Sequence, residues 1–309
     1  FGKAFVKRFF CTLFSKKSFC SRIYQHIVIV LINNMPIKKK KVNSNTDYII
    51  AIPTYKREDT ISKKTLKVLR KHRIPTNKIY LFVANKKQKK EYQSKVPTNY
   101  YGNIVVGVLG LKNQRNFISQ YFPEGQFIVE IDDDITSILQ IQNKVDPKNR
   151  LHNSLVTIKG LDKFIRKAFR LLQQNNLYLW GIYPVPNSYF MTPTTTKDLR
   201  FIVGPFWGMI NRHLTQLRQT IDEKENVERT IQFYHQDKGV IRFNYITIET
   251  SYYRNPGGMQ AENKNRKEES LKSAQYLSQK YPQYTKLYLK KKSGYAEVKL
   301  KDKTKKKTN

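Results

Sequence analysis

Acidic side chains and cysteines are scarce in this sequence. Against 58 lysines and arginines stand only 23 aspartates and glutamates, which gives a formal net charge of +35. Such a surplus favours polyanionic partners, namely nucleic acid or an anionic membrane surface. The two cysteines, Cys11 and Cys20, precede every segment with a folded pattern. The rest of the chain therefore has neither a disulfide framework nor a cysteine-based zinc site.

Long apolar runs and common cofactor signatures are also missing. The apolar run at residues 27–32 is far shorter than the roughly 18 residues that span a bilayer, so we expect no stable membrane insertion. No Gly-x-Gly-x-x-Gly or Walker sequence occurs, which argues against a dinucleotide fold and a P-loop. No asparagine lies in an N-x-S/T sequon, which favours a nuclear or cytoplasmic protein.

Composition divides the chain into three parts. Residues 1–46 are interpreted as a basic leader or arm outside the fold, with Met35 as the true start of translation. Residues 47–260 carry the pattern of a folded domain, and residues 261–309 read as a basic C-terminal helix and tail. A hydrophobic fraction of 39% provides enough apolar surface for a real core.

Apolar runs alternate with helical patterns in the first half of this domain. The expected strands are 48–52, 79–83, 104–109 and 127–131, and the expected helices lie near 60–72, 86–92 and 112–122. This alternation indicates an α/β fold with a parallel sheet and helices on both faces. The second half predicts a helix from about Leu161 and strand-like runs at 177–183, 201–210 and 240–250, hence a more mixed arrangement.

The sharpest chemical feature is the triplet Asp132-Asp133-Asp134 after the fourth strand. Ligands of open α/β sheets bind outside the carboxyl ends of the strands, where this triplet falls. Alternate residues point the same way, so Asp132 and Asp134 are candidates to share Mn²⁺ or Mg²⁺ with a bound polyphosphate. The alternative is a polar strand exit, but three adjacent carboxylates repel one another and are out of character in so basic a chain.

Two further segments are candidate nucleotide contacts. Lys112 and Arg115 open the helix before the triplet, where helix amides and cations favour an anion. The run Pro53-Thr54-Tyr55-Lys56-Arg57 follows the first strand, at the usual start of nucleotide sites in α/β folds, and offers an aromatic ring and a guanidinium for a nucleobase. Taken alone, the helix segment is better explained by ordinary solvated helix charge, and the loop at 53–57 is a weak signal.

Together these motifs resemble the GT-A glycosyltransferases with their DxD signature. The chain carries, in order, IPTYKR at 52–57, KNQRN at 112–116 and IDDDI at 131–135. The longer run GLKNQRN at 110–116, followed by YFP at 121–123, is similar to a narrower group. That group is the glycosyltransferases associated with TET/JBP oxygenases, which includes the base J glucosyltransferase. The resemblance extends more loosely through GPFWG at 204–208 and GGM at 257–259.

The resemblance implies a metal-dependent transfer of a hexose, with glucose from UDP-glucose as the expected case, to a hydroxymethylated base in DNA. Asp132 and Asp134 would hold the metal. The nucleotide sugar would be bound by residues of all three motifs: Pro53, Thr54, Tyr55, Arg57, Lys112, Arg115, Asp132 and Asp133.

Such enzymes use an acidic residue near a later helix start as the base. The best match is Glu225-Asn226-Val227-Glu228, where Asn226 replaces the second acid of the usual pair, so Glu225 and Glu228 both stay candidates with Asp222 behind them. A hydroxyl is a poor nucleophile at neutral pH, and a positioned carboxylate typically contributes about 10²–10⁴-fold. Without the resemblance, this segment would read as a solvated helical turn with a Glu225–Arg229 pair.

The basic C-terminal part is the expected DNA-binding region, because it interleaves tyrosines with lysines. Its proposed contacts are Lys264, Arg266, Lys267, Lys290, Lys291 and Lys292. The alternative is that its tyrosines pack on the domain. Two rival functions also stay open: transfer to a protein or glycan, and an inactive scaffold that binds nucleic acid.

Overall fold

The computed structural model describes residues 47–142, 153–250, 258, 266–289 and 296–301. All of these residues belong to one compact unit. The predicted leader at 1–46 lies outside the described residues. The predicted boundary at residue 260 also lies outside the described residues.

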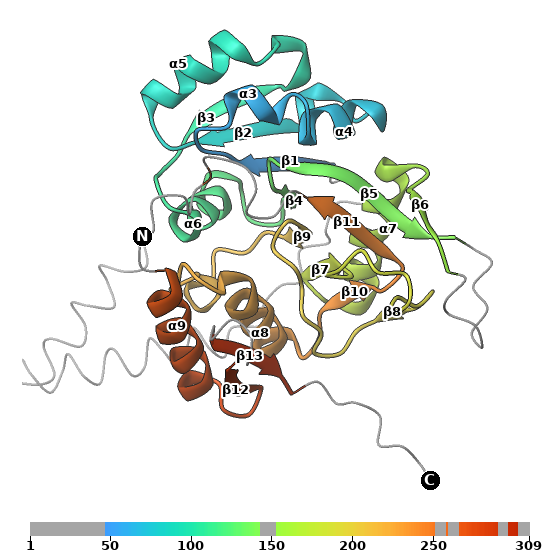
Figure 1. Ribbon diagram of the computed structural model, residues 1–309, viewed down its shortest axis with the longest axis vertical. Helices are drawn as coiled ribbons and strands as arrows, with labels where there is room; N and C mark the ends of the chain where they lie inside the picture. The colour runs from blue at the N-terminus through green and yellow to red at the C-terminus, as the bar shows by residue number, and fades with distance from the viewer. Residues whose placement is uncertain (1–46, 143–152, 251–257, 259–265, 290–295, 302–309) are drawn as a thin grey trace, which may run out of the picture. The chain divides into compact units, whose positions relative to one another are not determined.

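An eight-stranded sheet forms the centre of this unit, in the order β3-β2-β1-β4-β9-β7-β10-β8 (Figure 1). Strands β1, β2, β3 and β4 pair in parallel, β9 is antiparallel to both β4 and β7, and β10 runs parallel to β7. The predicted parallel first half and mixed second half are therefore confirmed. The strands are β1 (Tyr48–Pro53), β2 (Ile79–Val83), β3 (Asn103–Val106), β4 (Phe127–Ile131), β7 (Leu179–Ile182), β8 (Thr195–Thr196), β9 (Phe206–Ile210) and β10 (Ile241–Phe243).

Helices cover both faces of this sheet, as the sequence predicts. One face carries α3 (Glu58–Ile61), α4 (Thr65–Lys71), α5 (Lys86–Lys95) and α7 (Leu161–Asn175), whose apolar side chains share one core cluster with alternate strand residues. The opposite face carries α6 (Leu111–Tyr121) and α8 (Glu225–Asp237), which contribute Ile118 and Phe233 to a second cluster. Short 3₁₀ turns occupy Thr76–Lys78, Thr98–Tyr100 and Thr215–Leu217.

A second sheet, in the order β11-β5-β6, continues from the aspartate triplet. Its strands are β5 (Ile135–Ile141), β6 (Leu155–Thr157) and β11 (Ile246–Thr250). Three strand predictions are wrong in extent. The run 104–109 is a strand only as far as Val106. The run 240–250 is two strands in different sheets, because the chain turns at Asn244–Tyr245. The run 201–210 is extended only from Phe206, because Gly204 and Pro205 form a turn before it.

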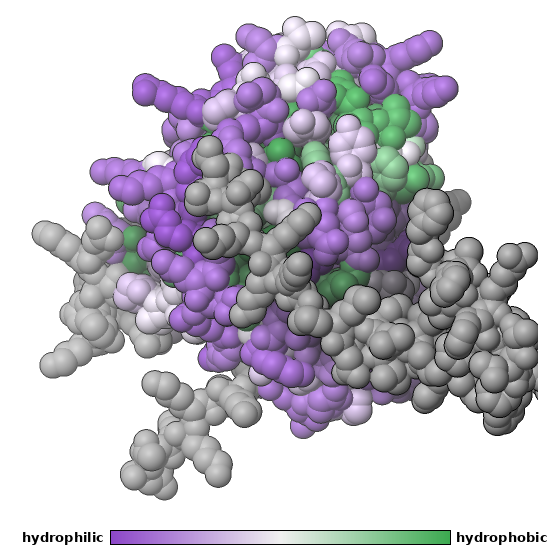
Figure 2. Space-filling model, turned by 180° about the vertical axis from the view of Figure 1, so that it is seen from behind, coloured by the Kyte–Doolittle hydropathy of each residue, from purple (hydrophilic) through white to green (hydrophobic). Residues whose placement is uncertain are grey.

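The C-terminal part packs onto α8 through α9 (Arg266–Lys280) and a hairpin of β12 (Thr285–Leu289) and β13 (Ala296–Leu300). Tyr276, Tyr281 and Tyr284 pack against this apolar cluster, which confirms the packing alternative for them. Tyr288 is 44% exposed. The hairpin was not predicted, since its lysines obscure the strand pattern. Hydrophilic side chains cover most of the coloured surface in Figure 2, and no described helix is long and apolar enough to cross a membrane.

Candidate functional site

The aspartate triplet forms a tight link between the two sheets, at the carboxyl edge of β4. The Asp132 amide donates to the Pro205 carbonyl over 2.9 Å, and the Thr65 hydroxyl donates to the Asp132 carbonyl over 2.6 Å. The same Thr65 oxygen accepts the Ile135 amide at 2.9 Å. Backbone contacts from three directions therefore fix where each carboxylate points.

Asp133 faces the loop after β1. Its carboxylate accepts the Thr54 hydroxyl at 2.6 Å and the Arg57 guanidinium at 2.5 Å, and the residue is only 3% exposed. Burial raises the pKa of Asp133 to about 6, against the opposing effects of Arg57 and Thr54. Asp133 therefore holds the loop at residues 53–57 in place, and the donor contact predicted for it stays a prediction.

Asp132 and Asp134 remain the two carboxylates nearest to an open edge. The Asp132 side chain is 29% exposed and meets Arg115 at 3.2 Å. Asp134 meets Arg57 at 3.3 Å and accepts the Thr250 hydroxyl at 2.7 Å. Burial raises the pKa of Asp132, Arg115 opposes this, and the charge of Asp134 adds to it. The charges of Asp132 and Asp134 therefore interact, and the shared cation predicted for them stays a prediction.

Hydrogen bonds support the loop at residues 53–57. The Tyr92 hydroxyl lies 2.6 Å from the Thr54 hydroxyl and accepts the Arg57 amide at 3.0 Å, while Pro53 and Thr54 are buried. Tyr55 is 7% exposed, so its ring is more enclosed than a nucleobase platform would need. The amide of Gly258 donates to the Tyr55 carbonyl over 2.8 Å, which brings a distant part of the chain onto this loop.

Arg115 connects the triplet to the buried interior beneath α6 and α8. One guanidinium nitrogen meets Glu130 at 2.7 Å, the other meets Asp132 at 3.2 Å, and Glu225 lies 4.0 Å away. The Arg115 side chain is 2% exposed, and its pKa is raised because the carboxylates outweigh burial. The predicted role of Arg115 at the triplet therefore has a geometric basis, with Glu130 as its second anchor.

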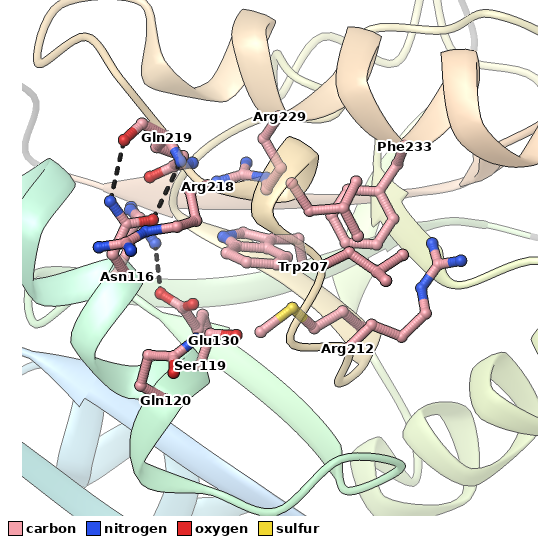
Figure 3. A pocket seen from close by; sticks show the side chains of 14 residues that line it. Asn116, Ser119, Gln120, Glu130, Trp207, Arg212, Arg218, Gln219, Arg229 and Phe233 are labelled. Carbon is pink, nitrogen blue, oxygen red and sulfur yellow. Dashed lines mark hydrogen bonds and ion pairs between the residues drawn. The ribbon is translucent and has the colours of Figure 1, made fainter. Parts of the chain in front are cut away.

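A pocket lies behind Arg115 on the same face of the sheet (Figure 3). Arg229 from α8 lies flat over the Trp207 indole, with its guanidinium carbon 3.7 Å from the ring centre. Burial lowers the pKa of Arg229 to about 9, and the nearby Arg115 adds to this effect. The pocket is lined by Arg115, Asn116, Ser119, Gln120, Glu130, Trp207, Met209, Arg212, Leu214, Leu217, Arg218, Gln219, Arg229 and Phe233.

The two candidate bases differ sharply in their surroundings. Glu225 begins α8 beside Arg115, is 5% exposed, and has its pKa raised by burial. Glu228 is fully buried, and its carboxylate accepts the Thr220 amide and hydroxyl at 2.7 and 2.6 Å and the Ile221 amide at 3.3 Å. Glu228 thus anchors the segment before α8, whereas Glu225 lies with the triplet and Arg115.

Lys112, another predicted residue, has its partners outside the aspartate triplet. Lys112 pairs with Asp222 at 3.1 Å and donates to the Thr220 carbonyl at 3.3 Å, so it is tied to the segment before α8. Lys267 is exposed on α9, and Arg266 begins that helix. Lys264, Lys290, Lys291 and Lys292 lie outside the described residues.

Sequence reasoning gave no site role to Glu130 or Thr250, named Arg229 only as a possible partner of Glu225, and named Gly258 only within the GGM run at 257–259. Glu130 had a usable signal, because it is the single charge inside an otherwise apolar strand. Glu130 and Asp132 alternate along β4, so both face α6. Thr250 and Gly258 carry no local signal, because only the antiparallel pairing of β11 with β5 returns the chain to the triplet. Among the described residues, no group of three or more histidines, cysteines, aspartates or glutamates could hold a metal alone.

Comparison with known proteins gives a limited result. No family model matches the chain, and no curated protein matches it. Its fold is similar to the S. aureus TarS 1-349 structure at 15% identity and TM-score 0.41, over 65% of this chain and 59% of that chain. A second S. aureus TarS structure matches at 16% identity and TM-score 0.40, over 65% of this chain and 36% of that one. A mycobacterial protein matches at 9% identity and TM-score 0.42, over 84% and 85% of the two chains.

Proposed function

We propose that this chain is a metal-dependent glycosyltransferase of the GT-A type. The observation that carries this is the meeting of Asp132, Asp134, Arg57, Arg115 and Glu225 at the carboxyl edge of β4. That edge is where open α/β sheets bind nucleotides. Two arginines and two carboxylates at one edge suit a diphosphate with a divalent cation.

The donor set fits Mn²⁺ or Mg²⁺. Asp132 and Asp134 supply hard oxygen ligands at the end of a strand, and Asp132 is partly open to solvent. Such cations are typically held by one or two carboxylates together with substrate phosphates, so two residues suffice here. The metal, when bound, would offset the charge that develops on the departing diphosphate.

The protein's own groups then divide the work. Arg57 and the rest of the loop at residues 53–57 orient the nucleoside. The contacts among Thr54, Asp133 and Tyr92 hold this loop in one conformation. Arg115 is placed to meet the diphosphate beside Asp132. Glu225 is the base that accepts the hydroxyl proton of the acceptor. Its burial favours a raised pKa, which brings a carboxylate closer to the operating pH of a general base.

Hydroxymethylated DNA is the acceptor that we propose. The net charge of +35 supports it, and so does a loop after β7 that exposes Val185 by 53%, Tyr189 by 44% and Phe190 by 58%. Since β7 runs parallel to β4, this loop leaves the sheet at the same edge as the triplet. Exposed aromatic rings stack on unpaired bases, at about 1–3 kcal/mol per base.

That loop is pre-organised for binding. The Ser188 hydroxyl donates to the Asn153 carbonyl over 2.6 Å, and Met191 behind it is 1% exposed. Tyr189 and Phe190 meet edge to face, with 4.9 Å between their ring centres. A rigid aromatic tip loses little conformational entropy when it binds, which favours recognition. A duplex acceptor would still have to extrude its modified base to reach Glu225.

The test is transfer of radiolabel from UDP-glucose to DNA that contains 5-hydroxymethyluracil or 5-hydroxymethylcytosine, with Mn²⁺ or with EDTA. We expect metal-dependent label on the modified DNA, and loss of label in Asp134→Ala. UDP release without labelled DNA would retain the transferase and refute the DNA acceptor. Salt-sensitive DNA binding without label or UDP release would refute the enzyme and support a binding module.

A further inference from the structure

The interior behind the candidate site holds a cluster of five charges, four of them buried. Asp132, Glu130 and Glu225 are the carboxylates, and Arg115 and Arg229 are the guanidinium groups. Arg115 contacts all three carboxylates within 4.0 Å. Arg229 differs, because none of its three nitrogens has a hydrogen-bond partner among the described residues, although the residue is 2% exposed.

Arg212, a second arginine that lines the same pocket, forms an ion pair and serves as a comparison for Arg229. Arg212 stacks on Tyr178 with 3.7 Å between its guanidinium carbon and the ring centre. It also donates to both carboxylate oxygens of Asp237, at 2.9 and 2.6 Å. Arg229 makes a similar contact with Trp207, at 3.7 Å, but no described carboxylate forms a hydrogen bond with it. The two arginines therefore differ in pairing and not in packing.

The position of Arg229 follows from the α8 sequence. Residues 225, 229 and 233 lie one turn apart on the face of α8 that meets the sheet, and all three are buried. Glu225 stands at the open edge, Arg229 lies one turn deeper, and Phe233 lines the inner pocket. The expected i,i+4 ion pair does not form, since Arg229 lies over Trp207 and Glu225 faces Arg115.

Burying an unpaired guanidinium is costly, because its hydration is lost and no hydrogen bond replaces it. A neutral side chain of similar length would fill the same space over Trp207 without this cost. The charge of Arg229 acts instead on the carboxylates around it. Arg229 lowers the pKa of Glu225, Glu130 and Asp132. The nearby Arg115 in turn lowers the pKa of Arg229.

We propose that Arg229 is a positioning residue for the transfer step, which rests on the proposed function. Its charge repels Arg115 towards Glu130 and Asp132 and attracts the Glu225 carboxylate from behind. It also adds a fixed positive charge in a water-poor interior, beneath the place where the diphosphate departs. Charges that are oriented before the reaction stabilise developing negative charge without further reorganisation. Arg229 itself touches neither substrate.

The test compares Arg229→Met with Arg229→Lys and with the matched control Arg212→Met. Steady-state UDP release gives kcat and KM for the donor, and thermal unfolding gives stability. Residues that act through another typically cost about 10–100-fold when removed. We therefore expect Arg229→Met to lower kcat by about that factor with KM for UDP-glucose within about twofold, and Arg229→Lys to recover most of kcat.

The control should show the reverse pattern. Arg212→Met leaves Asp237 buried without its partner, so Tm should fall further than in Arg229→Met, while kcat stays near the wild-type value. Three results would overturn the proposal: an unchanged kcat in Arg229→Met, a raised donor KM with unchanged kcat, or no recovery with lysine. A wild-type protein that releases no UDP would instead overturn the proposed function, and this inference with it.

Discussion

Replacing the two candidate bases one at a time gives the most decisive test of the site. Glu225→Gln keeps the size and packing of the side chain but removes the oxygen that accepts the acceptor proton. Glu225 touches Arg115 only at 4.0 Å, so little hydrogen bonding is lost. We expect kcat for transfer to fall about 10²–10⁴-fold, with a change in Tm of only a few degrees.

Glu228→Gln should have the opposite effect. The Glu228 carboxylate accepts three hydrogen bonds, from the amide and hydroxyl of Thr220 and the amide of Ile221. In a glutamine, the side-chain NH₂ group would face at least one of these donors and could not accept its hydrogen bond. Hydrogen bonds to a charged group contribute about 1.5–3 kcal/mol each, so losing part of the set costs about 2–4 kcal/mol. For a domain of this size that lowers Tm by about 5–15 °C.

Both variants are assayed together, by label transfer at a temperature where each is folded and by thermal unfolding. The reasoning predicts a crossed outcome: Glu225→Gln is stable and inactive, and Glu228→Gln is unstable and active. An inactive Glu228→Gln with wild-type Tm, beside an active Glu225→Gln, would refute the assignment. It would mean that the segment before α8 opens and exposes Glu228 during turnover.

Three further predictions follow from individual contacts. Asp134→Asn should abolish the thermal stabilisation by MnCl₂ with UDP, which for the wild type would reach about 2.7 kcal/mol at 100 times Kd; a retained shift would contradict the metal assignment. Gly258→Ala should raise the donor KM, because the new Cβ would lie 2.7 Å from Arg57 Nη2. The control Gly125→Ala has a similar positive φ but no neighbour within 4 Å of the new Cβ, so KM should stay unchanged. Phe190→Ala should weaken DNA binding by about 1–3 kcal/mol without changing its salt dependence, measured by fluorescence anisotropy between 50 and 200 mM salt, and a reduced salt slope would show that the loop acts through phosphates instead.

The sequence predicts the sheet well where apolar runs are continuous. Strands β1, β2 and β4 are buried on both faces by α4, α7 and α6. Their sequences are therefore almost continuously apolar and easy to recognise as strands. The prediction fails where the chain changes sheets. At Asn244–Tyr245 nothing in the local pattern shows that β10 pairs with β7 while β11 pairs with β5. That choice depends on distant partners and not on propensity.

The candidate site is predictable to the extent that it lies in consecutive residues. The triplet and the loop at 53–57 were visible because strand ends concentrate polar groups. The partners that decide what each carboxylate does were not visible. Thr250 reaches Asp134 from 116 positions away, and Arg57 reaches Asp133 from 76 positions away. Only the folded structure shows which carboxylates are already paired by these contacts.

The three adjacent aspartates therefore have different partners in the structure, although the sequence motif groups them together. The tight link from β4 to β5 aims successive side chains at different elements: Asp132 at α6, Asp133 at the loop after β1, and Asp134 at β11. Like charges side by side are tolerated because Arg57 and Arg115 approach from opposite sides and separate them. Asp133 is the most enclosed, and its contacts order the loop that would receive the nucleoside. A substitution there should consequently act on donor affinity through the loop, whereas Asp132 and Asp134 should act through the metal.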